Sequence, residues 1–248
     1  TMSIDGSEGN ASGKTYIYMA IARSHKPASE FAATNLFTPT TNPNNSSAPY
    51  WTATHVIDTF WQKNTTSGGW YVGDRLRQKR ELQLNSTAAE GGASNHTFDY
   101  QTGVGAGASG SNAFRWLFRR ARGFYDVVTY DGTDSDRTQA HNLGVAPELI
   151  LIKRRGPSGA DWVWYVGPLG AGNYMYGDAG AKLSSTTVWN NTSPTESVFS
   201  LGAISSSYYR TNGSGSTYVA YLFATVAGIS KIGSYTGTGS DLNVDCGF

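Results

Sequence analysis

The stretch that decides the fold occurs twice, as AFRWLFRRARGFYDVVTYDG at residues 113–132 and as YVAYLFATVAGISKIGSYTG at residues 218–237. Identical residues align at an offset of 105 positions: Leu117 with Leu222, Phe118 with Phe223, Gly123 with Gly228, Tyr130 with Tyr235 and Gly132 with Gly237. The first half of the pattern occurs a third time, since TYIYMAIA at 15–22 resembles TYVAYLFA at 217–224. Repetition at a fixed distance indicates tandem copies of one unit.

The middle parts of the two copies align as well. HVIDTFWQKNTTSGGWYV (55–72) matches PELILIKRRGPSGADWVW (147–164) at an offset of 92, which places Trp70 on Trp162 and Lys63 on Arg155. Apolar and polar residues alternate with period two, which is typical of strands with one buried face. The sequence therefore predicts an all-β protein of tandem antiparallel β-sandwich units, jelly-roll-like, with a period of about 100 residues.

The alignment also predicts where the units begin and end. Residues 34–122 form one β-sandwich unit and residues 123–227 form a second. Residues 1–24 are expected to be the closing strands of a preceding unit, and residues 228–248 the opening strands of a following unit. This indicates a piece of a longer polypeptide. The sequence leaves open whether the two end segments pair with each other, with a second chain or with other residues.

Composition narrows the classes of partner. Only 15% of the 248 residues are charged and the formal net charge is +1, so we expect neither nucleic acid nor an anionic membrane as a partner. No stretch is apolar enough to predict membrane insertion. Cys246 is the single cysteine, which excludes an internal disulfide and a cysteine-rich metal site.

Three motifs resemble binding sites but favour simpler interpretations. GNASGKT (9–15) has one residue too few for a phosphate-binding loop and leads into a strand pattern. DGTDSD (131–136) spaces three aspartates like a calcium loop but lacks the distal glutamate, so a hairpin turn is favoured. The histidines have no paired spacing, and His141 is expected in a turn. We therefore expect no metal and no cofactor.

Charged residues provide no recognisable catalytic pattern. The acids of the first unit are scattered, and nothing in their spacing selects a glycosidase pair: Asp58, Asp74, Glu81, Glu90 and Asp99. The basic run RWLFRRAR (115–122) falls on a predicted closing strand, where charges facing solvent would block the addition of another strand. We therefore predict no catalytic residues and a protein that is not an enzyme.

Longer motifs carry a family resemblance that covers nearly the whole chain. HNLGVAPELILIKRR, WNNTSPTESVFSLG, NGSGSTYVAYLFATVAGISKIGSYTGTG and the final DCGF resemble the repeated β domains of bacteriophage tail-fibre and related virion proteins. KNTTSGGWYVGDRLRQKRELQLNSTAAE in the first unit is similar to the same domains, although Arg77-Gln78 stands where family members often carry glycine. The resemblance implies a β-sandwich for each unit, a location in the virion, contact with other virion proteins and a homo-oligomer, with a trimer favoured.

The leading hypothesis is a non-enzymatic segment of a phage tail fibre or adhesin that attaches to the host surface. Host polysaccharide would be contacted through exposed aromatic rings, for which Trp51, Trp61 and Trp189 are the candidates. Two alternatives remain open: a capsid or head-decoration protein, and a polysaccharide depolymerase with two carboxylates facing each other in a cleft.

Overall fold

A computed structural model describes residues 2–4, 11–21, 32–41, 47–65, 68–92, 96–105, 113–177, 180–203 and 211–248. Nearly all regular structure in these residues is β-strand, and the sheets are antiparallel, which confirms the predicted all-β fold. The described helices are two 3₁₀ turns, η1 (Ala33–Asn35) and η2 (Gly167–Leu169). No helix in the described residues is long and apolar enough to cross a bilayer.

The first unit consists of a six-stranded sheet and a two-stranded sheet. The large sheet has the order β3-β10-β5-β6-β7-β8, formed by β3 (Phe37–Thr41), β10 (Ala113–Phe118), β5 (Thr59–Asn64), β6 (Trp70–Asp74), β7 (Arg80–Gln83) and β8 (Gly91–Gly92). The small sheet pairs β4 (Trp51–Thr52) with β9 (Gly103–Val104). The two sheets enclose an apolar core that contains Trp51, Phe60 and Leu117.

The second unit repeats this arrangement strand for strand. Its large sheet has the order β11-β18-β13-β14-β15-β16, formed by β11 (Tyr125–Asp131), β18 (Thr217–Phe223), β13 (Leu149–Arg154), β14 (Val163–Val166), β15 (Asn173–Tyr176) and β16 (Lys182–Ser184). Its small sheet pairs β12 (Arg137–Ala140) with β17 (Val198–Leu201). The enclosed core contains Ile150, Leu222 and Phe199.

The registers of paired strands refine the alignment of the repeat. Leu117 pairs with Phe60 in the first unit, and Leu222 pairs with Ile150 in the second, so β5 aligns with β13 at an offset of 90. The predicted match of Lys63 to Arg155 was therefore wrong by two residues, and Lys63 is equivalent to Lys153. The longer β13–β14 turn of the second unit absorbs these two residues, because β6 and β14 keep the offset of 92.

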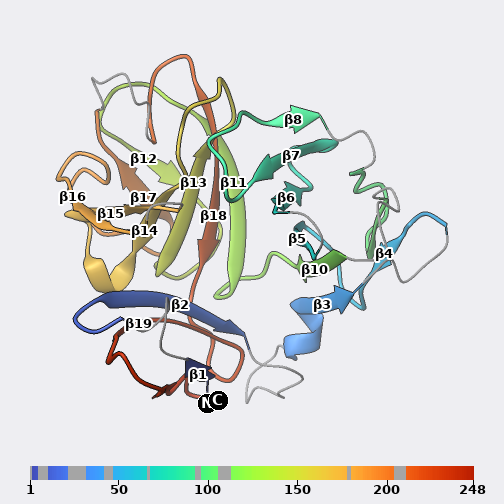
Figure 1. The fold of residues 1–248 in the computed structure, drawn as a ribbon. Helices are drawn as coiled ribbons and strands as arrows, with labels where there is room; N and C mark the ends of the chain where they lie inside the picture. The colour runs from blue at the N-terminus through green and yellow to red at the C-terminus, as the bar shows by residue number, and fades with distance from the viewer. Residues whose placement is uncertain are drawn as a thin grey trace.

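The two end segments of the chain pair with each other (Figure 1). β1 (Met2–Ile4) pairs with β20 (Leu242–Val244), and β2 (Thr15–Ile21) pairs with β19 (Ser230–Thr236). This β2–β19 pair has the register of β18 with β11, shifted by the repeat offsets. We call β1, β2, β19 and β20 the closing module.

Side-chain contacts confirm that the closing module copies the second unit. Tyr16 and Tyr235 stack with ring centroids 5.2 Å apart at 15°, and the equivalent Tyr218 and Tyr130 stack at 5.2 Å and 14°. The hydroxyls of Tyr16 and Tyr218 each accept a backbone hydrogen bond of 2.8 Å from the residue five positions earlier. The sequence left open what the two end segments pair with. The structure pairs them with each other, in the same way as β18 pairs with β11.

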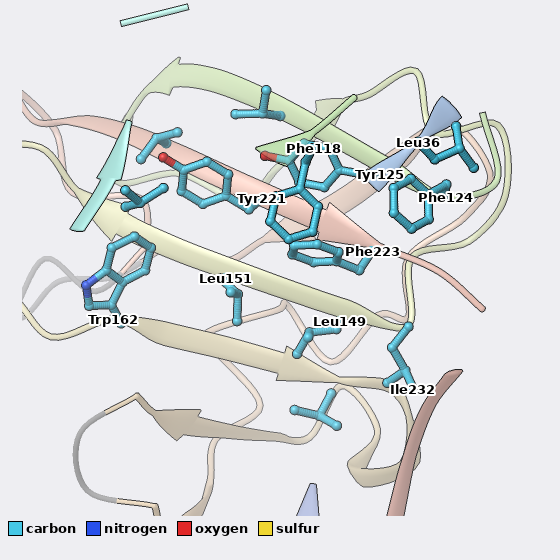
Figure 2. Close-up of a cluster of buried hydrophobic side chains, with 14 of the residues drawn as sticks. Leu36, Phe118, Phe124, Tyr125, Leu149, Leu151, Trp162, Tyr221, Phe223 and Ile232 are labelled. Atoms are coloured by element: carbon cyan, nitrogen blue, oxygen red, sulfur yellow. The ribbon is translucent and has the colours of Figure 1, made fainter. Parts of the chain in front are cut away.

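The largest core lies between the units rather than inside either one (Figure 2). The outer face of the first large sheet packs on the outer face of the second, with Phe118, Tyr125 and Phe223 at the contact. Ile232 of β19 packs on the same cluster, so the closing module covers part of it. Strands at the contact are therefore covered on both faces, and all six residues of β13 are buried.

DGTDSD forms a polar turn between β11 and β12, but the predicted hairpin was wrong, because β11 pairs with β18 and β12 pairs with β17 in a different sheet. Asp134 has φ of 56°, and its repeat equivalent, Gly239, has φ of 79°. The Thr133 hydroxyl accepts a hydrogen bond from Ser135 N, and Thr238 accepts one from Ser240 N in the same way. The backbone conformation of this turn is left-handed at its fourth residue in both copies.

We predict that Asp134→Gly stabilises the protein by up to about 1 kcal/mol, because glycine has no Cβ to oppose a left-handed conformation. Asp134→Ala should destabilise it, since alanine keeps the Cβ and lacks the polar side chain that tolerates this region. Chemical denaturation of the three proteins measures both effects. A loss of stability in the glycine variant would contradict the strain argument.

The basic run at 115–122 was wrongly predicted to present charges at a sheet edge. β10 lies between β3 and β5, and Arg115 is 1% exposed. Arg120 lies beyond the strand, where its backbone N–H donates to Asp58 Oδ2 at 2.7 Å. Thr225 N donates in the same way to Glu148 at 3.3 Å in the second unit. These acids hold the linker that leaves each unit.

Candidate interaction groove

A groove runs along β2 where the closing module meets the two large sheets. One cavity of about 670 Å³ lies between β2, the first unit and the second unit. A second cavity of about 370 Å³ lies against the outer face of β3 and β10, and it shares Met19, Trp61 and Trp70 with the first. A third of about 520 Å³ continues along β2 past Lys14 and Thr15 toward Met175 and Lys182.

Aromatic side chains form the floor of the groove. Trp70 of β6 and Trp116 of β10 stack with centroids 5.5 Å apart and planes 5° apart. Trp61 of β5 packs at 54° on Phe118, with centroids 5.4 Å apart. Trp164 of β14 lines the side formed by the second unit. Four of the seven tryptophans of the chain therefore meet at one surface.

Few polar groups line the two cavities that contain Trp61. The side-chain amide of Asn85 already has partners within the protein. Its Oδ1 accepts a hydrogen bond from Trp70 N at 3.1 Å, and its Nδ2 donates one to Gly68 O at 2.8 Å. The indole N–H groups of Trp61 and Trp164 are buried without a hydrogen-bond partner in the described part of the chain. No carboxylate, histidine or cysteine is among the lining residues, so this surface is suited to binding.

The three tryptophans predicted to contact glycans have different positions. Trp51 lies in the core of the first unit and Trp189 in the core of the second, with exposures of 2% and 1%. Because each ring is buried in a core, neither can stack on a sugar. We therefore exclude both as glycan contacts. Trp61 is half-buried and lines the groove. Trp70 is also half-buried there, whereas its repeat partner Trp162 is buried.

A polar network crosses the interface between the units. Arg77 Nε donates to Asp74 Oδ2 at 2.6 Å, Nη1 donates to Glu90 Oε1 at 2.8 Å, and Nη2 donates to the Tyr221 hydroxyl at 2.7 Å. Tyr221 in turn donates to Asp74 Oδ2 at 2.7 Å. Arg155 of the second unit reaches Glu90 at 2.9 Å.

The network explains the conformation of the turn at Arg77-Gln78. The backbone has positive φ at Gln78 and Lys79, directly after Arg77, and the Arg77 N–H donates to Asp74 Oδ1 at 3.0 Å. Burial raises the pKa of Tyr221 well above its usual value, which keeps its hydroxyl protonated as a donor. Asp74 and Glu90, which the sequence presented as isolated acids, thus hold the two units together.

A second buried polar cluster lies inside the first unit. The Arg115 guanidinium lies 4.6 Å and 4.2 Å from the ring centroids of Trp51 and Phe60, and its Nε donates to Gln62 Oε1 at 2.7 Å. Burial lowers the pKa of Arg115 to about 9. Burial and the Arg115 charge lower the pKa of His96 to about 3. His96 Nδ1 lies 3.3 Å from Glu81 Oε2 without hydrogen-bond geometry, which fits a neutral ring.

This cluster predicts a loss of stability in mild acid. The unfolded chain binds a proton at His96 below about pH 6.5, whereas the folded protein binds it only near pH 3. Stability from this residue is therefore complete above about pH 6.5 and falls by up to ~1.4 kcal/mol per pH unit as the pH decreases toward 3. His96→Gln should flatten the free energy of unfolding between pH 6.5 and 5. Equal slopes in both proteins would contradict the assignment.

The remaining predicted motifs form no metal or phosphate site in the described residues. Among the described residues, no three histidine, cysteine or acidic side chains group as metal ligands. Gly9, Asn10 and His25 lie outside the described residues, and the rest of GNASGKT leads into strand β2. The groove was missed because its tryptophans come from three distant parts of the sequence: the neighbouring strands β5 and β6, strand β10, and strand β14 of the second unit. The alignment of Trp70 with Trp162 in the repeat was the closest indication of the groove in the sequence.

Comparisons with known proteins assign no activity. The model of a family described as a domain of unknown function (DUF7483) matches residues 105–248, which is more than half of the chain. No curated protein and no solved structure matches the sequence.

Proposed function

This chain belongs to the family of domains of unknown function DUF7483, and from that premise we propose that it is a non-enzymatic structural segment of a virion fibre that takes part in host attachment. The observation that carries the proposal is the way in which successive units join. Their large sheets bury their outer faces against each other around Phe118, Tyr125 and Phe223. A fibre needs such rigid joints, because flexible linkers would not hold a receptor-binding surface at a distance.

Polar contacts across the joint support the same role. Tyr125 donates to Thr59 Oγ1 at 2.7 Å and Trp162 Nε1 donates to Gln83 O at 2.7 Å, so the units meet in one orientation. Two backbone hydrogen bonds also cross the joint. Glu90 N donates to Arg155 O at 2.6 Å, and Gly159 N donates to Thr87 O at 2.9 Å. Buried directional bonds define an angle between units that apolar packing alone would leave less specific.

Three of the five acids of the first unit support a non-enzymatic role: Asp58, Asp74 and Glu90. Asp58 accepts the backbone N–H of Arg120 and lies 3.8 Å from Arg75. Asp74 and Glu90 are engaged by Arg77 and Arg155. A general acid or base must reach its substrate, and these carboxylates are used within the protein instead.

Immunogold labelling of purified virus particles with antibodies raised against this chain tests the location. We expect labels on tail fibres. Labels on the head shell would favour the capsid or head-decoration alternative and contradict the fibre role, as would absence of the chain from the particle proteome.

Incubation of the chain with host capsule or lipopolysaccharide, followed by a reducing-end assay, tests the non-enzymatic role. We expect no release of new reducing ends, whereas released oligosaccharide would favour the depolymerase alternative. Fluorescently labelled chain should adsorb to host cells, and analytical ultracentrifugation should report a homo-oligomer, with a trimer expected. A failure of adsorption would remove the attachment role alone.

A further inference from the structure

We propose that the groove along β2 binds an extended β-strand of a partner polypeptide, which pairs antiparallel with the edge of β2 that faces away from β19. This inference does not depend on a virion location, because it rests on the described strands and cavities. Three sets of observations carry it: the pairing of equivalent strands, the partly covered face beside β2, and the chemistry of the groove.

The strands equivalent to β2 are paired on both edges. β10 lies between β3 and β5, and β18 lies between β11 and β13. In the described part of the chain, β2 pairs with β19 alone. β19 occupies the place of β3 and β11, so the edge of β2 that has no partner strand is the one that β5 and β13 cover in the complete units.

The hydrogen-bonding groups of that edge follow from the register. In the second unit, Arg155 N donates to Thr217 O and Glu148 N donates to Phe223 O, so alternate residues of β18 from Thr217 to Phe223 face β13. The equivalent residues of β2 are Thr15, Ile17, Met19 and Ile21. Their backbone groups therefore point toward the groove, while Gly237 N donates to Lys14 O on the opposite side.

The face beside this edge is only partly covered, since Phe37 and Trp116 are half-buried while Phe118 is buried, whereas the equivalent residues of the second unit are all buried. In the second unit, β11 and β18 are covered by strands of the first unit: Tyr125 contacts Thr59, Phe223 packs on Trp61 at 5.7 Å, and Tyr221 bonds to Asp74. The residues of the first unit that are equivalent to Tyr125, Tyr221 and Phe223 are Phe37, Trp116 and Phe118. All three line the cavity of about 370 Å³ beside Met19.

One added strand would thus both pair with the edge of β2 that faces away from β19 and cover part of the aromatic face beside it. A strand paired with β2 would stand in the place of β5 and β13, and its outward face would lie over the half-buried Phe37 and Trp116. Leu149, Leu151 and Trp164 already face β2 across the groove. This is the same use of strand faces that joins the first unit to the second.

The groove selects a polypeptide strand as occupant. β13 is buried on both faces, so its counterpart is expected to be apolar on both faces, with a lysine at the position shared by Lys63 and Lys153. A strand supplies backbone donors and acceptors at the spacing of the β2 edge.

A peptide with the sequence of residues 147–156, PELILIKRRG, is the probe, and the full chain is the receptor. Fluorescence anisotropy of the labelled peptide should show saturable binding, which a scrambled peptide lacks. Hydrogen exchange should show new protection at the amides of Ile17 and Met19. Protection elsewhere with unchanged exchange in β2 would overturn the proposal.

Two N-methylated peptides provide a matched comparison. Methyl groups on the amides of Leu151 and Lys153 block the edge that β13 turns toward β18, whereas methyl groups on Ile150 and Ile152 block the opposite edge. The first peptide should bind at least about tenfold more weakly than the unmodified peptide, since two edge hydrogen bonds are lost. The second should retain most of its affinity. Equal affinities would overturn the assigned edge.

Ile17→Pro is the matched change in the receptor. Proline removes an N–H that the fold does not use on this edge, and edge positions tolerate it. Circular dichroism should remain unchanged while peptide binding is lost, and retained binding would contradict the proposal. Protection of the Ile17 and Met19 amides in the unliganded chain, together with a stable oligomer, would identify a second copy as the occupant instead. Displacement of the peptide by host polysaccharide would identify a glycan site.

Discussion

Arg77→Leu is expected to lower the free energy of unfolding by about 3–5 kcal/mol, because it leaves buried carboxylates without their cation. The side chains of Arg77 and Asp74 are 0% exposed, and that of Glu90 is 9% exposed. The substitution also removes a donor from the Tyr221 hydroxyl. Urea denaturation measures the effect as a shift in the midpoint at constant slope.

Arg80→Leu is the control for this substitution, because Arg80 begins β7 three residues later and is exposed. Its effect should stay within about 0.5 kcal/mol, as for ordinary surface changes. Tyr221→Phe should cost about 1–3 kcal/mol by removing one member of the network. The double variant with Arg77→Leu should cost less than the sum of the two, since both changes break the same network. Additive costs would show that the network does not act as a unit.

Phe223→Ala is expected to destabilise the protein by about 3–5 kcal/mol, because it opens a cavity where the units meet. The ring is 2% exposed, and its centroid lies 4.9 Å from Tyr125, 5.7 Å from Trp61 and 6.0 Å from Phe118. Two of these partners belong to the first unit. A single substitution at the end of β18 should therefore weaken both units together, which calorimetry would detect as a lower transition temperature.

Phe114→Ala provides the comparison in an equivalent strand. Phe114 lies in β10 and is 43% exposed, so its removal should cost well under 1 kcal/mol. If Phe223→Ala had a similarly small effect, the core between the units would not contribute to folding as its burial implies. Separate transitions for the two units in the unmodified chain would contradict the joint in the same way.

The two buried networks differ in how far the sequence indicates them. Arg77-Gln78 stands where the resembling domains often carry glycine, which put the family pattern in doubt at this one turn. Nothing in the sequence shows that Tyr221 meets Asp74 and Glu90, because it belongs to the other unit and more than a hundred residues of chain separate it from both acids. Arg115 was predicted to face solvent for a related reason. The alternation of apolar and polar residues distinguishes the two faces of a strand, but it does not show what covers each face.

Local pattern predicted most of the strands, since side chains alternate across a strand and turns require glycine or polar residues. The predicted units contain the two large sheets, and the duplicated glycines mark the same turn, with φ of 77° at Gly123 and 72° at Gly228. The polar turn at Asp134 and its repeat equivalent at Gly239 also share a left-handed conformation. Each of these features depends on residues that are close together in one strand or one turn.

The sequence by itself thus determined the all-β class, the duplication and the absence of a recognisable catalytic pattern. Only the tertiary structure decided that outer faces of the large sheets are buried against each other, that Trp51 and Trp189 belong to cores, and that Trp61 lines a groove. Only the tertiary structure paired β2 with β19 and left its second edge without a described partner strand. The physical reason is that periodicity records which side chains share a face, whereas burial depends on contacts between distant segments.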